Sequence, residues 1–262
     1  MSTLETIPNS KKEVLVEILL RLADDRLILG HRLSEWAGHA PELEEDLALA
    51  NIALDMIGHA SALYGYAAQL EDKPDEDHYA YFRDDIDFKN IALTELPRGD
   101  FAFTTARLFL FSTFSYLLYN NITQVIEEEQ FNGIIKKHFN EIKYHLRHSR
   151  EWVLRLGDGT DLSKLKIQQA IDDLWMYTGE MFETDKTENL AAGYNLFIDV
   201  PVLKNEWMKW VTETLEEATL KTPDNNQYMF TGSRQGRHTE HLGRLLAEMQ
   251  FLRRSYPDAD WK

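Results

Sequence analysis

The feature that most constrains this chain is the return of apolar residues every three or four positions along several long segments. In residues 11–37 such residues mark one face of a helix, at Val14, Ile18, Leu22, Leu29, Leu33 and Trp36. Similar segments cover residues 41–70, 100–128 and 131–156. Four helices of about 25 residues each predict a bundle, because each helix must bury its apolar face.

Shorter helices are predicted after the fourth long one, over residues 161–182, 201–223 and 238–255. The polar connection over residues 71–90 has room for one short helix, and the run YNLFIDV is too short to predict a sheet. No repeat or domain boundary is visible. We therefore predict an all-α protein with a four-helix core and additional C-terminal helices, forming a single domain over residues 1–262.

The segment from Phe101 to Ile126 contains no Asp or Glu and is apolar on nearly all sides. Its most apolar window, Leu108 to Tyr119, is shorter than the roughly 20 apolar residues that span a bilayer. We interpret the segment as a buried helix and expect no membrane insertion.

Composition excludes several classes of function. The net charge of -16 disfavours binding to nucleic acid or anionic lipid. The absence of cysteine excludes disulfides, thiolate-bound zinc, iron–sulfur clusters and a cysteine nucleophile in this chain. The N-terminal residues lack the uninterrupted apolar run of a signal peptide, so we expect a cytoplasmic protein.

A helix bundle can house a di-iron centre if two helices each supply a Glu and two others each supply Glu-x-x-His. None of the nine histidines in this chain has Glu three positions earlier. Met56 stands in that position before His59, and Ile142 stands there before His145. Since the helix after Asp100 offers no carboxylate, we expect neither a metal site nor a catalytic residue in this chain.

Two interpretations of the remaining polar residues stay open. Asp55 and Glu141 each lie four positions before a histidine, which is one helix face. With Glu35, these residues form either a vestigial, metal-free polar network or a displaced metal site; the set is Glu35, Asp55, His59, Glu141 and His145. Near the C-terminus, His238 and His241 lack a third ligand, and we interpret them as the start of a helix.

Three stretches of the sequence together resemble a known family. These are LADDRLILGHRLSEWAGHAPELEEDLALANIALDMIGHA, EIKYHLRHSREWVLRLGDGT and HTEHLGRLLAEMQFL. They are similar to the PaaC family, the ferritin-like subunits without metal that belong to bacterial phenylacetyl-CoA epoxidases. The resemblance covers nearly the whole chain and implies a ferritin-like fold.

The resemblance also implies a role. Such a subunit pairs with a catalytic di-iron subunit in a hetero-oligomer that epoxidises the ring of phenylacetyl-CoA during aerobic phenylacetate degradation. Electrons come from a separate reductase carrying flavin and iron–sulfur groups and using NADPH. On this basis we expect a structural subunit with no cofactor and no activity of its own.

Two other functions are kept as alternatives. One is an autonomous ferritin-like metalloprotein that uses the displaced site, and the other is a helical adaptor for unrelated partners. The sequence leaves open whether the chain also associates with itself.

Overall fold

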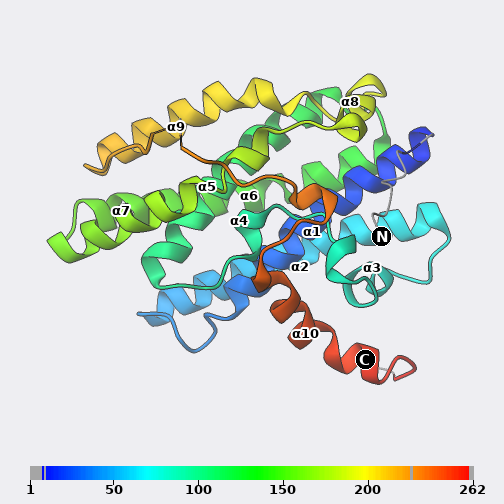
Figure 1. Ribbon diagram of the computed structural model, residues 1–262, viewed down its shortest axis with the longest axis horizontal. Coiled ribbons are helices and arrows are strands. Elements are labelled where there is room, and N and C mark those ends of the chain that lie inside the picture. The colour runs from blue at the N-terminus through cyan, green and yellow to red at the C-terminus, as the bar shows by residue number, and fades with distance from the viewer. Residues whose placement is uncertain (1–7, 9, 225–226, 260–262) are drawn as a thin grey trace.

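The computed structural model describes residues 8, 10–224 and 227–259. Four long helices form the body of the molecule: α1 (Lys11–Ser34), α2 (Leu43–Glu71), α5 (Phe101–Val125) and α6 (Glu129–Gly157). α1 packs against α2, α5 packs against α6, and α2 also lies against α6 (Figure 1). The described residues contain no strand, so the predicted all-α, ferritin-like bundle is confirmed.

Shorter helices surround this bundle. α7 (Asp161–Trp175) and α9 (Lys204–Glu217) lie against α5 and α6, whereas α8 (Lys186–Gly193) lies against α1. α3 (Asp77–Tyr81) and α4 (Ala92–Glu95) are part of the long connection from α2 to α5. α10 (Glu240–Ser255) packs on α3 and α4, at the red end of the chain in Figure 1.

The helix starts follow from side chains that accept backbone hydrogen bonds. Asp100 caps α5 by accepting a hydrogen bond from the backbone N–H of Phe103, as its position in the sequence predicts. Ser10 caps α1 and Thr160 caps α7 in the same way. These caps satisfy N–H groups that have no partner within the helix.

Several predicted helix ends were too late in the chain. The first helix ends at Ser34 rather than at residue 37, because Trp36 turns inward and its indole N–H donates to the hydroxyl of Thr104. The helix predicted over 161–182 stops at Trp175 and is followed by a 3₁₀ turn, Gly179–Phe182. The helix predicted over 201–223 begins at Lys204 and ends at Glu217.

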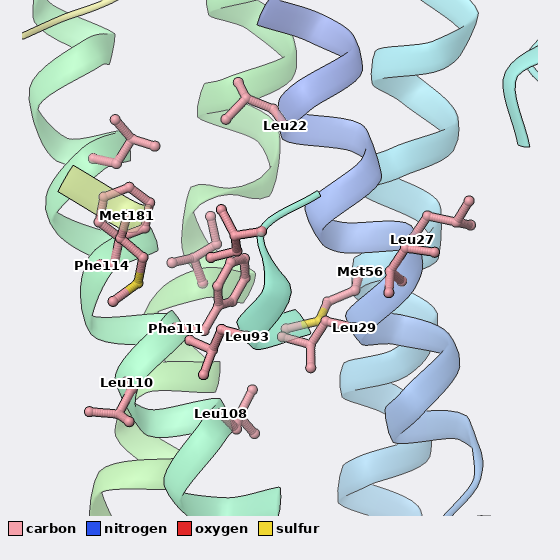
Figure 2. Close-up of a cluster of buried hydrophobic side chains, with 14 of the residues drawn as sticks. Leu22, Leu27, Leu29, Met56, Leu93, Leu108, Leu110, Phe111, Phe114 and Met181 are labelled. Atoms are coloured by element: carbon pink, nitrogen blue, oxygen red, sulfur yellow. The ribbon is translucent and has the colours of Figure 1, made fainter. Parts of the chain in front are cut away.

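Apolar side chains of α1, α2 and α5 meet in the interior, with Leu93 of the short helix α4 among them (Figure 2). α1 and α2 come close at Gly30, where an added Cβ would lie 2.9 Å from Cγ1 of Ile57. A side chain at residue 30 would force the two helices apart.

α2 and α5 are long and apolar enough to cross a membrane by length and composition alone. In α5, 83% of the apolar window is buried inside the molecule, which confirms its predicted place in the core. In α2 the corresponding share is 44%, and Leu43, Leu47 and Leu54 of this helix are exposed.

Candidate functional site

The centre of the bundle is where a ferritin-like protein would place its metal ligands. Met56 of α2 and Ile142 of α6 are buried there, 4% and 5% exposed, each one turn before a histidine. α5 contributes Ser112 and Ser115 to the same small cavity. At these positions α2, α5 and α6 present apolar or hydroxyl groups, and the carboxylates of Asp55 and Glu141 line the cavity from the residues just before Met56 and Ile142.

The fourth helix, α1, presents a cation. Arg26 is 3% exposed, and its Nε–H donates to Nδ1 of His59 over 3.1 Å. Its Nη1 donates to the carbonyl of Leu22, and its guanidinium carbon lies 4.6 Å from the ring centroid of Tyr119. The guanidinium therefore occupies the polar centre and is hydrogen-bonded to one of its histidines.

This contact determines the protonation state of His59. Because Nδ1 accepts a hydrogen bond from an arginine, the ring proton is on Nε2, which lies 3.1 Å from the hydroxyl of Tyr119. Burial, and then the positive charge of Arg26, lower the pKa of His59 well below its usual value. His59 is a neutral imidazole in the folded protein.

His59 also stacks on a second imidazole. The ring of His138, from α6, lies parallel to it with 4.2 Å between centroids. His138 Nδ1 lies 2.7 Å from a carboxylate oxygen of Glu141. His138 precedes His145 by seven residues, so the two share one face of α6.

The carboxylates do not pair with the histidines four positions after them. Asp55 of α2 instead reaches across to α6, where its Oδ2 lies 3.0 Å from Nε2 of His145. Glu141 pairs with His138 rather than with His145. The ring nitrogens of His59 are already occupied by Arg26 and Tyr119, which leaves no position for Asp55.

Glu35 lies outside this centre. It is the C-cap residue of α1, and its side chain, 38% exposed, forms an ion pair of 2.7 Å with Arg32. The structure thus gathers Asp55, His59, Glu141 and His145 around one cavity and leaves Glu35 elsewhere. Helix geometry is the reason, because Glu35 follows Arg26 by nine residues and so lies more than two turns farther along α1 and on its opposite side.

Sequence reasoning missed Arg26 and His138, although both carried a signal. Arg26 falls four residues after Leu22 and three before Leu29, so it completes the apolar stripe of the first helix. His138 falls three residues after Ile135 and four before Ile142, on the apolar face of its own helix. A polar residue within such a stripe is a candidate for a buried contact.

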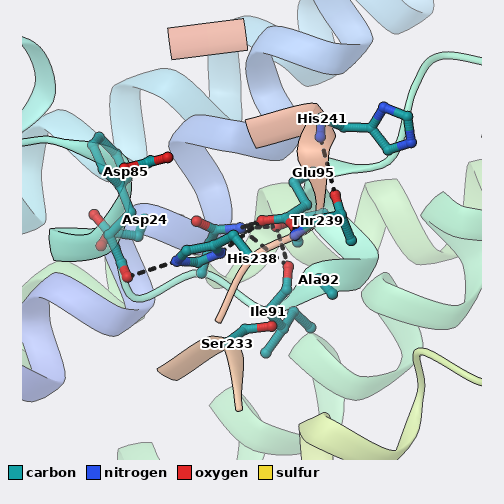
Figure 3. A network of polar contacts seen from close by, with 12 residues as sticks. Asp24, Asp85, Ile91, Ala92, Glu95, Ser233, His238, Thr239 and His241 are labelled. Carbon is teal, nitrogen blue, oxygen red and sulfur yellow. Dashed lines mark hydrogen bonds and ion pairs between the residues drawn. The ribbon is translucent and has the colours of Figure 1, made fainter. Parts of the chain in front are cut away.

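A second buried polar cluster connects the C-terminal segment to the bundle (Figure 3). Glu95, fully buried at the end of α4, accepts hydrogen bonds from His238 Nδ1 and from the backbone N–H of Thr239. His238 Nε2 lies 3.0 Å from the carbonyl of Phe88. An oxygen thus lies beside each ring nitrogen of His238, an arrangement that favours the imidazolium form.

The environment of His238 agrees with that charge. Burial alone would lower its pKa, but the hydrogen bond and the negative charge of Glu95 raise the pKa above its usual value. Both ring nitrogens are engaged, so His238 is not placed to share a metal with His241. We call these contacts of Glu95 with His238 and Thr239 the C-terminal clasp.

Comparison with known proteins identifies the family. The family model described as phenylacetic acid catabolic protein matches residues 1–261. The chain belongs to this family. A protein of Escherichia coli (strain K12) that is named as a subunit of 1,2-phenylacetyl-CoA epoxidase is 44% identical over 242 residues, covering 92% of this chain and 97% of that relative. The resemblance seen in the three sequence motifs is confirmed.

Ferritin-like bundles commonly hold a di-iron centre, and the residues at the centre of this one do not fit it. A guanidinium hydrogen-bonded to His59 repels a cation, and Met56 and Ile142 supply no oxygen. Within the described part of the chain, no three His, Asp or Glu side chains converge in a way that could hold a metal ion.

Proposed function

We propose that this chain is a structural, non-catalytic subunit of a phenylacetyl-CoA epoxidase and that it supports the di-iron subunit of that complex. The observation that carries the proposal is the Arg26–His59 hydrogen bond, which puts a permanent cation at the position of a metal site. The name of the Escherichia coli relative, a subunit of a 1,2-phenylacetyl-CoA epoxidase, supports the choice of complex.

In this proposal the chain acts as a single cytoplasmic domain and holds no cofactor. The di-iron centre belongs to the partner, and NADPH, flavin and iron–sulfur groups belong to a reductase component. The contribution of this chain is mechanical: a rigid bundle that covers apolar helices of the partner keeps the residues around the partner's metal in place.

The outward face of α2 is the surface that best suits such a partner. Leu43, Leu47 and Leu54 are 72%, 57% and 66% exposed, and their spacing puts them along one side of the helix. An exposed row of leucines on a soluble bundle marks an interaction surface. We propose that a helix of the di-iron subunit packs against this row.

Co-expression with a di-iron subunit of the same complex tests the proposal. The two chains are expected to purify together, and iron measured on the separated chains is expected in the partner alone. Stoichiometric iron and turnover in this chain alone would instead support the autonomous metalloprotein. Failure to bind the di-iron subunit would support the adaptor.

A further inference from the structure

The helices α2 and α6 lie side by side and antiparallel along one flank of the bundle. Asp55 of α2 lies 3.0 Å from His145 of α6, and farther along α2 the side chain of Gln69 accepts a hydrogen bond of 3.0 Å from Gln130, near the start of α6. Residues 56–68 of α2 are therefore level with residues 131–144 of α6. We call the exposed and partly exposed residues within 43–65 of α2 and 133–147 of α6 the α2/α6 face.

Three glycines of the α2/α6 face border open space. A Cβ added to Gly58, Gly65 or Gly133 would contact nothing within 4 Å outside its own turn of helix, in contrast to Gly30, which the close packing of α1 on α2 requires. All three lie inside helices, where alanine is more stable because glycine loses more backbone freedom on folding. Packing within this chain thus does not account for them, and they leave bare backbone that another helix can approach closely.

Exposed leucines continue this stretch of α2 toward its N-terminus. Leu47, Leu54, Gly58 and Gly65 follow one another at intervals of seven, four and seven residues, which puts them on one side of the helix. The two leucines are 57% and 66% exposed. Large apolar side chains beside bare backbone suit the apolar side of a helix from another protein.

The neighbouring helix, α6, carries a row of cations on the same face. Every exposed charged residue from Gly133 to Arg147 is positive, although the whole chain has 44 acidic and only 28 basic residues. The one acid in this stretch, Glu141, has a side chain 35% exposed and is paired with His138. The exposed cations are Lys136, Lys137, Lys143 and Arg147.

We propose that the α2/α6 face binds an amphipathic helix of the di-iron subunit, with its apolar side on the leucines and glycines of α2 and an acidic edge along the cations of α6. The inference rests on the proposed function, because it takes the same partner and adds the chemistry of the segment that docks. Charge complementarity favours this occupant: an acidic edge meets cations here, whereas the net charge of -16 repels it from the surface as a whole.

The two halves of the face have different tasks. The apolar contact with α2 holds the complex together, because burial of leucine side chains does not depend on ionic strength in the way that charge attraction does. The cations of α6 speed the encounter and fix which edge of the incoming helix lies next to α6. Changes to the two halves should therefore affect different measurements.

The first test reverses the charge of the row. Lys143→Glu combined with Arg147→Glu is expected to slow association with the di-iron subunit at least tenfold at low ionic strength, an order-of-magnitude expectation for lost electrostatic steering. The difference should shrink in high salt, where exposed charges are screened. Lys204→Glu combined with Lys209→Glu, two exposed residues of α9, makes the same change in net charge and is the control. Equal association rates of the two double variants would overturn the proposal.

The second test fills the open space at Gly58. Gly58→Leu should weaken the complex at least tenfold, as an order-of-magnitude expectation for a side chain placed where two helix backbones meet. The unfolding temperature of the free chain should not fall, since leucine favours a helix more than glycine does. Ala247→Leu, at an exposed position of α10, is the control and should bind like the parent. Unchanged affinity of Gly58→Leu would contradict the docking of a helix at this position.

The outcomes separate this inference from the proposed function. If the parent chain does not bind the di-iron subunit, both are wrong. If the parent binds and the variants at α6 and Gly58 bind equally well, the proposed function stands and the inference alone is wrong. If the parent by itself is a dimer that Gly58→Leu separates, the face belongs to a second copy of this chain, which also overturns the inference.

Discussion

The guanidinium Nε of Arg26 lies 3.1 Å from Nδ1 of His59, at the centre of a bundle built like those that hold two irons. One hydrogen bond makes the histidine a neutral acceptor and introduces a positive charge that metal ions avoid. A bundle stabilised by its own cation keeps its shape without iron. This independence from iron suits the supporting role that we propose for the chain.

The first prediction concerns that cation. Arg26→Met should lower the free energy of unfolding by about 1–3 kcal/mol, because Nδ1 of His59 loses its donor and the carbonyl of Leu22 loses its side-chain donor. Adding His59→Leu should recover part of the loss, since two apolar residues leave no buried acceptor on the ring. Urea unfolding of the two variants and the parent measures both effects. Equal stability of Arg26→Met and the parent would contradict the role assigned to this contact.

The second prediction is a loss of stability in mild acid. The folded protein keeps His59 neutral, whereas the unfolded chain takes up a proton there below the ordinary histidine pKa of 6.5. Stability is therefore complete above that pH and falls as the pH drops below it, by at most about 1.4 kcal/mol per pH unit for one proton. His59→Gln should reduce this slope when urea unfolding is measured across the acid range. Lowered pKa values at His31, His78 and His148 act in the same direction and contribute to the slope that remains.

The third prediction concerns the C-terminal clasp. Glu95→Gln removes the charge that holds His238 as an imidazolium, so α10 should exchange its amide hydrogens faster while α5 stays protected. Hydrogen exchange followed by mass spectrometry resolves the two helices. Glu240→Gln, in an exposed pair with Arg244, is the control. Unchanged exchange in α10 would mean that apolar contacts alone hold it.

The clasp also has a pH dependence of opposite sign. Because the pKa of His238 is raised in the folded protein, its ion pair with Glu95 stabilises the fold fully below pH 6.5, the pKa of a histidine in the unfolded chain. This stabilisation is lost as the pH rises through the higher pKa of the folded state. In Glu95→Gln this high-pH loss should disappear.

The fourth prediction places the partner on α2. Leu47→Lys combined with Leu54→Lys should abolish or strongly weaken co-purification with the di-iron subunit, because two ammonium groups would have to be buried in an apolar contact. The thermal stability of this chain alone should be unchanged, since both side chains face outward. Leu165→Lys, on α7 and 67% exposed, is the matched control. If the control variant alone fails to form the complex, the interface lies on α7 rather than on α2.

Helical periodicity in the sequence predicted the four long helices and the burial of α5, because one buried face leaves a regular trace in the order of residues. Asp100 belongs to the residue types that commonly cap helices, and capping depends only on neighbours in the sequence. Helical periodicity failed at the end of α1, where the Trp36–Thr104 hydrogen bond joins residues 68 positions apart. Contacts of that kind have no local signature.

The candidate site was predictable to a similar extent. Spacing identified His59 and His145 as facing inward and Met56 and Ile142 as non-ligands. It put Asp55 and Glu141 on the same helix faces as His59 and His145 but could not give their partners, His145 and His138, because hydrogen bonding depends on the relative rotation of the helices and on which ring atoms are already occupied. The stacking of His59 on His138 depends on the same rotation.

The buried acids Asp25 and Glu95 find their cations near the end of the chain, at Arg234 and His238. Each carboxylate also accepts a hydrogen bond from the connection between α2 and α5, Asp25 from the backbone N–H of Ile91 and Glu95 from Nδ2 of Asn90. Without residues 233–239 both carboxylates would keep only these neutral donors, and a buried charge without a cation is costly. The C-terminal segment thus neutralises charges that the first half of the chain has buried.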